Sequence, residues 1–232
     1  MTRRDEIAAG LDAVRRRIAA AAAAAGRSAD EVTLVAVTKF FPASDVRILA
    51  DLGVTDVGEN RHPEAGDKCA ECQDLALRWH FIGGLQSNKA AAVGAYADVV
   101  ESVDRRKLVD ALNRGAHVRG HPVDVLLQVG LDPPNRTGRA GAEAADLPAL
   151  AEAVEAAGML RLRGLMAVAP LGEDPEAAFA RLAAIRADFL GARPDADWLS
   201  AGMSGDLEAA IGAGATHVRV GSAILGARPG IQ

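Results

Sequence analysis

One stretch decides the fold: Val32-Thr33-Leu34-Val35-Ala36-Val37-Thr38-Lys39, followed by Phe40-Phe41-Pro42. The apolar run is typical of a buried parallel strand, and Pro42 opens the next segment. Lys39 therefore stands at a strand end among apolar and aromatic neighbours. Desolvation there favours the neutral amine, which is the form that attacks a carbonyl carbon. The alternative is a lysine whose ammonium group reaches from the strand end into solvent.

Two glycine-rich turns near the other end of the chain are candidate phosphate seats: Gly202-Met203-Ser204-Gly205 and Arg219-Val220-Gly221-Ser222. Ser204 is the predicted N-cap of a helix over Gly205–Gly212, where its hydroxyl and the free backbone amides suit an anion. An ordinary capped helix explains the same motif. A nucleophilic lysine together with a phosphate seat indicates a phosphorylated aldehyde held as a Schiff base, and pyridoxal 5'-phosphate (PLP) is the obvious candidate.

Short apolar strands alternate with Ala-rich helices along the whole chain, which is the pattern of a parallel sheet built from βαβ units. The predicted strands are Thr33–Val37, Asp56–Gly58, Trp79–Ile82, Asp98–Ser102, Val123–Val129, Leu162–Ala167, Trp198–Ser200 and Val218–Val220. The predicted helices include Arg4–Ala25, Ala43–Leu52, Arg105–Arg114, Ala144–Ala157, Pro175–Leu190 and Gly205–Gly212. We therefore expect an α/β fold over residues 1–232, a single-domain (β/α)8 TIM barrel with an extra N-terminal helix.

An open doubly wound sheet is the alternative architecture. It usually carries a Gly-rich phosphate turn after its first strand. In this chain the first strand ends in Lys39, and the glycines gather at the last two strands. Phosphate sites in closed barrels often use the loops after strands seven and eight, so the barrel is favoured.

A closed barrel carries its functional residues where its strands end. Lys39 ends the first predicted strand, Asn60 the second and Ser200 the seventh. Asn60 either holds a ligand hydroxyl or caps the next helix. Period-two alternation places Arg219 on the same side of its strand as His217. A guanidinium inside a barrel must be paired, and beside a pyridine nitrogen it would keep that nitrogen unprotonated; a salt bridge at the barrel rim is the alternative.

The composition bounds the partners. The 232 residues carry a net charge of -5, so the overall field does not recruit nucleic acid or anionic membrane. No apolar stretch reaches the ~20 residues of a membrane span, and charged residues interrupt the N-terminal Ala-rich segment. We therefore expect a cytoplasmic protein. Cys69 and Cys72 are predicted to be two helical thiols one turn apart, with a redox switch as the alternative; no metal site is expected.

A series of motifs resembles the pyridoxal phosphate homeostasis protein family, which is similar in fold to the N-terminal barrel of bacterial alanine racemase. The matching segments, in chain order, are Leu34–Lys39, Gly58–Asn60, Trp79–Gly83, Leu85–Lys89, Arg163–Met166, Leu199–Ser204, Asp206–Ile211 and Arg219–Gly226.

The resemblance implies an internal aldimine of PLP on Lys39, phosphate contacts around Ser204, Gly221 and Ser222, and Arg219 near the pyridine nitrogen. Asn60 and Ser200 complete the predicted cofactor-binding set. The implied role is to buffer PLP or deliver it to apo PLP-dependent enzymes, with no established catalysis. Monomer and weak homodimer both stay open.

An enzyme is the alternative function, either a racemase or a Schiff-base aldolase. Alanine racemases take a tyrosine from a second domain as their opposing base. This chain ends at Gln232, and its one tyrosine, Tyr96, is expected on the N-terminal face of the barrel. His80 is expected to be a structural hydrogen-bonding residue rather than a base. Four departures from the family pattern bear on loop details and on a secondary lysine for cofactor handover: Thr38-Lys39-Phe40, Arg61, Gly84 and Arg136, the last where the family often has a lysine.

Overall fold

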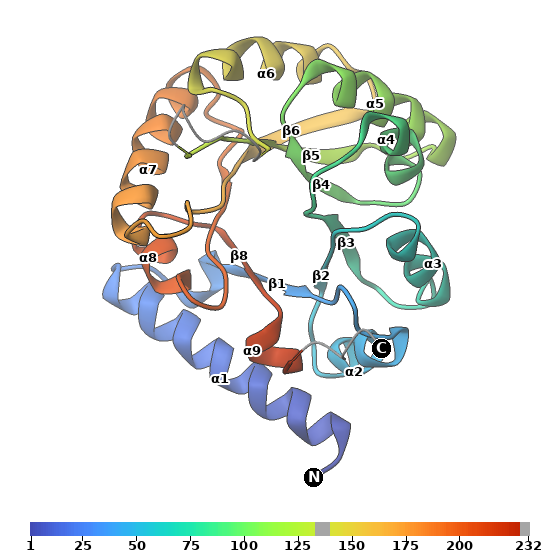
Figure 1. The fold of residues 1–232 in the computed structure, drawn as a ribbon, viewed down its shortest axis with the longest axis vertical. Helices are drawn as coiled ribbons and strands as arrows, with labels where there is room; N and C mark the ends of the chain where they lie inside the picture. The colour runs from blue at the N-terminus through green and yellow to red at the C-terminus, as the bar shows by residue number, and fades with distance from the viewer. Residues whose placement is uncertain (133–139, 228–232) are drawn as a thin grey trace.

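The computed structural model describes residues 1–132 and 140–227, which form a closed parallel barrel surrounded by helices (Figure 1). The strands pair in chain order, and β8 returns to pair with β1. Their bounds are β1 (Thr33–Val37), β2 (Asp56–Glu59), β3 (Arg78–Phe81), β4 (Val99–Val103), β5 (Val123–Gln128), β6 (Leu160–Met166), β7 (Trp198–Ser200) and β8 (His217–Val220). The predicted (β/α)8 barrel is confirmed, and the open sheet is excluded.

The helices of the described residues form the outer layer of the barrel (Figure 1). They are α1 (Arg3–Ala24), α2 (Ala43–Asp51), α3 (Glu64–Glu71), α4 (Ser87–Gly94), α5 (Arg106–Arg119), α6 (Leu147–Glu155), α7 (Pro175–Ala192), α8 (Leu207–Gly212) and α9 (Ser222–Leu225), with 3-10 turns at Ala29–Glu31 and Ala144–Asp146. The predicted helix Ala144–Ala157 is therefore divided into a 3-10 turn and α6. The predicted end of α5 at Arg114 is too early, because the helix continues to a left-handed cap at Gly120.

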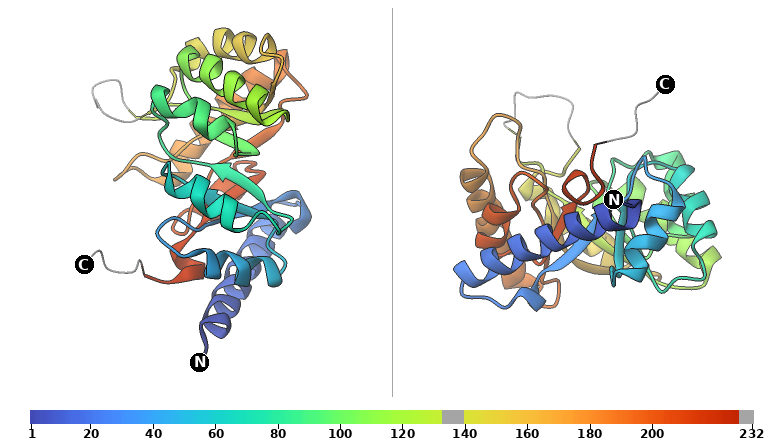
Figure 2. Two further views of the ribbon diagram at one scale, coloured as in Figure 1. Left: turned by 90° about the vertical axis from the view of Figure 1, so that its right-hand side faces the viewer. Right: turned by 90° about the horizontal axis from the view of Figure 1, so that it is seen from below.

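The extra N-terminal helix α1 runs along the outside of the barrel beside α8 and α9 (Figures 1 and 2). Thr2 and Asp5 form a capping box at its start. Its buried stripe is Ile7, Leu11, Val14 and Ile18, which repeats at helical spacing. Gly10 lets the helix approach α9, because a Cβ there would lie 2.6 Å from the carbonyl oxygen of Ile224.

The barrel interior combines a small apolar layer with buried charged groups. Val99, Leu126 and Met166 pack together from β4, β5 and β6. His80, Glu101 and Arg219 are also buried, and they come from β3, β4 and β8. Among the described residues, no helix has both the length and the apolar character needed to cross a membrane.

Candidate cofactor site

A cavity opens at the carboxyl ends of β1 and β8, and four predicted cofactor residues line it: Lys39, Arg219, Gly221 and Ser222. The rest of its lining is Val37, Phe41, Ile82, Met203 and Gly226. Strand pairing brings these distant segments together, since Ala36 of β1 lies opposite Val220 of β8. The cavity thus lies at the end of the barrel where enzymes of this fold carry their sites.

Lys39 sits on a tight turn at the end of β1. The backbone N–H of Phe41 donates to the carbonyl oxygen of Thr38 at 3.0 Å, which closes a four-residue turn. Phe40 has a φ of 70°, and it is the one non-glycine residue with positive φ in the described part of the chain. Positive φ at the third residue is the requirement of a type II turn, which glycine normally meets. Lys39 is half-buried and is presented to the cavity by this turn.

Ser204 lies beside the cavity without lining it, and its Oγ is 3.5 Å from the Oγ of Ser222. The predicted N-cap role of Ser204 is wrong, because α8 begins at Leu207 with Asp206 in the N-cap position. The carboxylate of Asp206 accepts from the backbone N–H of Met203 at 2.6 Å and closes the preceding turn. The helix therefore starts later, and the Ser204 side chain turns toward Ser222.

Gly221 allows close packing of β8 against β1. A Cβ at this position would lie 3.0 Å from the carbonyl oxygen of Val37 and 3.2 Å from its Cβ. Any side chain would therefore have to push the neighbouring strand end away. Gly221 thus keeps the backbone of the β8 turn accessible at the cavity wall.

Arg219 points into the barrel, as the alternation predicts, and it is only 4% exposed. Its guanidinium donates to the Ser200 Oγ at 2.6 Å and to the carbonyl oxygen of Ala167 at 2.9 Å. The Glu101 carboxylate lies 3.6 Å away. Ser200 is itself fully buried and does not line the cavity. Its hydroxyl donates to Glu101 at 2.6 Å, so Ser200 contacts Arg219 and Glu101 rather than the cavity.

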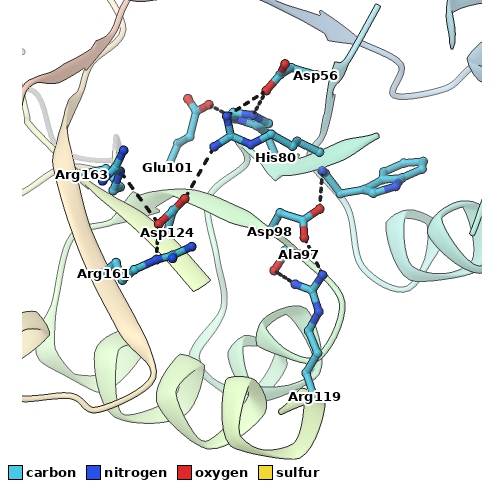
Figure 3. Close-up of polar contacts among 11 residues, drawn as sticks. Asp56, His80, Ala97, Asp98, Glu101, Arg119, Asp124, Arg161 and Arg163 are labelled. Carbon is cyan, nitrogen blue, oxygen red and sulfur yellow. Dashed lines mark hydrogen bonds and ion pairs between the residues drawn. The ribbon is translucent and has the colours of Figure 1, made fainter. Parts of the chain in front are cut away.

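A column of hydrogen-bonded charges continues from Arg219 toward the opposite end of the barrel. The ring of His80 lies between two carboxylates, with Nδ1 2.7 Å from Glu101 and Nε2 3.0 Å from Asp56 (Figure 3). Burial opposes a charged imidazole, but these two hydrogen bonds raise the pKa of His80 above its usual value. Burial also opposes a charged Glu101, yet the contacts with His80 and Arg219 lower the pKa of Glu101 to about 2. The expectation that His80 is a structural hydrogen-bonding residue agrees with this geometry.

A second group of charged side chains lies beyond His80, at the amino-terminal end of the barrel strands (Figure 3). The guanidinium of Arg78 lies 3.6 Å from both Asp56 and Asp124. Arg161 donates to Asp124 at 2.8 Å. These ion pairs are partly exposed and belong to the end of the barrel away from Lys39.

His217 differs from its neighbour His80. Burial lowers the pKa of His217 to about 4, and its ring centroid lies 4.5 Å from that of Trp198. The two imidazoles inside the barrel are therefore shifted in opposite directions: the pKa of His80 is raised and the pKa of His217 is lowered.

Asn60 follows β2 and lies outside the cavity lining. Its backbone packs against Gly83, where a Cβ would come within 2.4 Å of the Asn60 carbonyl oxygen. The side-chain Oδ1 of Asn60 is buried and has no hydrogen-bond partner among the described residues. A buried acceptor without a donor is costly, so this atom is suited to a hydroxyl or a water molecule.

The remaining predicted residues lie away from the cavity. Cys69 lies within α3 and Cys72 at its end, and both thiols are free. Burial raises the pKa of Cys69 to about 11 and also raises that of Cys72, so both stay protonated at neutral pH. Tyr96 stacks on His62 with ring centroids 6.0 Å apart and does not line the cavity. Arg136 lies outside the described residues.

Two buried charged residues were not predicted from the sequence, Glu101 and Lys68. Glu101 lies inside the apolar strand β4, and a charged residue at such a position is a signal that could have indicated a buried ion pair. Lys68 is buried on α3 and contacts Glu59 and the carbonyl of Thr38, directly before Lys39. No periodic signal marks Lys68, because the segment around it is polar. Of these two partners, Glu59 ends β2 and Thr38 directly follows β1.

Comparison with known proteins agrees with this geometry. The family model for the N-terminal domain of alanine racemase matches residues 10–229. A pyridoxal phosphate homeostasis protein of Pseudomonas aeruginosa is 45% identical over 222 residues, covering 96% of both chains. The protein of that name from Escherichia coli K12 is 41% identical over 230 residues, covering 97% of both. PipY of Synechococcus elongatus, solved with PLP bound, is 36% identical with a TM-score of 0.81, over 95% of this chain and 100% of that chain. The chain therefore belongs to the pyridoxal phosphate homeostasis protein family, whose barrel matches the N-terminal domain of alanine racemase.

Proposed function

We propose that this protein binds PLP covalently through the amine of Lys39 and acts in cytoplasmic PLP homeostasis, by buffering the cofactor or delivering it to apo-enzymes. The observation that carries the proposal is the single cavity lined by Lys39, Arg219, Gly221 and Ser222. The names of the relatives and the PLP bound to PipY support the same ligand.

The residues around the cavity suit each part of PLP. Lys39 supplies an amine for the aldehyde carbon. The hydroxyls of Ser204 and Ser222, 3.5 Å apart, converge where a phosphate would accept hydrogen bonds. Arg219 supplies a fixed cation for the ring nitrogen, and the unpartnered Oδ1 of Asn60 suits a hydroxyl.

The charge of Arg219 favours holding the cofactor over chemistry on it. PLP supplies an aldehyde that condenses with amines and a ring that accepts electrons when its nitrogen is protonated. Burial lowers the pKa of Arg219, and the Glu101 carboxylate opposes that effect, so the guanidinium stays charged at neutral pH. A fixed cation beside the ring nitrogen disfavours its protonation. His80 is engaged on both nitrogens by carboxylates, which leaves neither nitrogen available to a substrate.

The test is to load the purified protein with PLP, reduce it with borohydride and map the modified peptide. The chain contains only four lysines: Lys39, Lys68, Lys89 and Lys107. We expect a visible absorbance band that reduces onto Lys39 and disappears in Lys39→Ala, while Lys89→Ala, at an exposed position, keeps it. An adduct on another lysine, or none after prolonged incubation, would contradict the proposal.

Two further measurements separate the parts of the proposal. Ser204→Ala should speed PLP dissociation without preventing the adduct, and unchanged dissociation would contradict the phosphate assignment. For turnover, we expect the loaded protein to exchange the α-proton of alanine in D2O no faster than Lys39→Ala. Fast exchange that depends on Lys39 would favour a racemase instead.

A further inference from the structure

The turn that carries Lys39 is in contact with a buried ion pair formed by Lys68 and Glu59. The Nζ of Lys68 on α3 lies 2.5 Å from the Oε1 of Glu59 at the end of β2. Both side chains are buried, with 7% and 2% of their surface exposed. A buried ion pair is expensive to desolvate, so its place in the fold deserves a reason beyond stability.

Both partners of this ion pair contact the residue before Lys39. The Oγ1 of Thr38 donates to Glu59 Oε1 at 2.7 Å. The ammonium of Lys68 donates to the carbonyl oxygen of Thr38 at 3.0 Å. That carbonyl also accepts from the backbone N–H of Phe41, which closes the turn. The side chain and the peptide of Thr38 are therefore fixed together.

The residue after Lys39 is held by the same helix. The backbone N–H of Phe40 donates to Glu64 Oε1 at 3.2 Å. Glu64 Oε1 in turn lies 3.7 Å from the ammonium of Lys68. Phe40 is the residue with positive φ, a conformation that persists only where surrounding contacts enforce it. The Glu64 contact is one such contact.

We propose that Lys68, with Glu59 and Glu64, forms a positioning brace for Lys39. The brace holds the peptides on both sides of Lys39, so that its amine meets the aldehyde of PLP in one orientation. This inference rests on the proposed function. In the bond-forming step the neutral Lys39 amine attacks the aldehyde carbon, its two protons pass to the carbonyl oxygen, and that oxygen leaves as water while a C=N bond replaces the C=O bond. Lys68 takes no part in that exchange and acts only through the turn.

The test compares Lys68→Met with Lys107→Met, since Lys107 is exposed and far along the chain on α5. Circular dichroism and thermal unfolding first establish that each variant is folded. Borohydride quenching at timed intervals after PLP addition then gives the rate of adduct formation on Lys39. Visible circular dichroism per bound cofactor reports whether the adduct adopts the same orientation.

We expect Lys68→Met to form the adduct about 10-fold to 100-fold more slowly than the wild type, with altered visible circular dichroism. Lys107→Met should match the wild type, and Lys68→Arg should recover part of the rate because it keeps the charge. The brace would be overturned by a folded Lys68→Met variant that forms the adduct within about twofold of the wild-type rate and shows the wild-type visible circular dichroism per bound cofactor.

A second variant covers the case in which Lys68→Met fails to fold. Thr38→Val removes one hydrogen bond to Glu59 and leaves the ion pair in place, so it should slow adduct formation by a smaller factor. A wild-type rate in Thr38→Val would then count against the brace. If the wild type itself forms no adduct on Lys39, it is the proposed function that fails, whereas a normal wild type with a normal Lys68→Met refutes the brace alone.

Discussion

Replacing Glu101 by Gln should cost this protein about 3 kcal/mol of folding stability at pH 7. Glu101 is 1% exposed, and its contacts with His80 and Arg219 lower its pKa to about 2 from the ordinary value of 4.5. Each unit of pKa is worth about 1.4 kcal/mol, so the fold prefers the charged carboxylate over the neutral carboxyl by about 3 kcal/mol. Gln resembles the neutral carboxyl in shape and charge, and it should lose that preference.

Because folding lowers the pKa of Glu101, the stabilisation by its charge is measured at a pH well above 4.5. A carboxyl whose pKa is lowered by folding stabilises the protein above its unfolded value near 4.5, and that stability is lost as the pH falls toward 2. Denaturant unfolding of the cofactor-free protein at pH 7 therefore samples the full effect. His80 keeps only Asp56 as its anionic partner in the variant, so its pKa should fall as well, which histidine NMR would detect.

The matched control is Glu155→Gln. Glu155 also pairs with an arginine, at 2.7 Å from Arg193, but its side chain is 46% exposed. Exposed pairs contribute roughly 0–1 kcal/mol. If Glu101→Gln loses no more free energy of unfolding than Glu155→Gln does, the stabilising role assigned to the buried Glu101 carboxylate is refuted.

Two other perturbations test the fold around the site. Because burial lowers the pKa of His217 to about 4, the unfolded chain takes up its proton first, and stability should fall by up to about 3 kcal/mol as the pH drops from 6.5 to 4. Urea titrations across this range give the free energy of unfolding as a function of pH. This pH dependence should disappear in His217→Asn and persist in His121→Gln, whose side chain is exposed. A His217→Asn variant with the pH dependence of the wild type would contradict the assignment. Gly10→Ala should destabilise the protein by about 1–3 kcal/mol, because its Cβ would lie 2.6 Å from the Ile224 carbonyl oxygen. Gly191→Ala, on α7 with nothing within 4 Å, should instead gain about 0.5–1 kcal/mol, and equal melting temperatures for the two variants would exclude the close packing of α1 on α9.

The sequence predicts the barrel because its signal is repeated. Each strand is a short apolar run, and each lies between segments of helical composition, so errors at single boundaries leave the topology intact. The interior position of Arg219 was also predictable, since alternation along one strand is a local property.

The partners of these side chains were not predictable in the same way. Arg219, Ser200, Glu101 and His80 come from four strands, and which of them meet depends on the register and tilt of the whole barrel. The N-cap prediction for Ser204 was wrong for a local reason. The Asp206 side chain accepts the hydrogen bond from the Met203 backbone N–H, and α8 begins only after Asp206. Lys68 left no signal, since a lysine in a polar helix is ordinarily solvated.

The two ends of the proposed site depend on different parts of the molecule. The position of Lys39 depends on a turn, and that turn is held by side chains of β2 and α3. The position of Arg219 depends on strand pairing, since its partner in β1 is Val35, and on the buried contacts with Ser200 and Glu101. Because side-chain contacts rather than strand pairing hold the Lys39 turn, changes near Lys39 should alter how fast the cofactor is taken up and released. Changes in the charge column should instead alter the stability of the barrel and the electrostatic environment of the ring nitrogen. We therefore expect the kinetics of PLP exchange to change more in variants of Lys68 than in variants of Glu101, although both side chains belong to buried ion pairs whose loss lowers the free energy of unfolding.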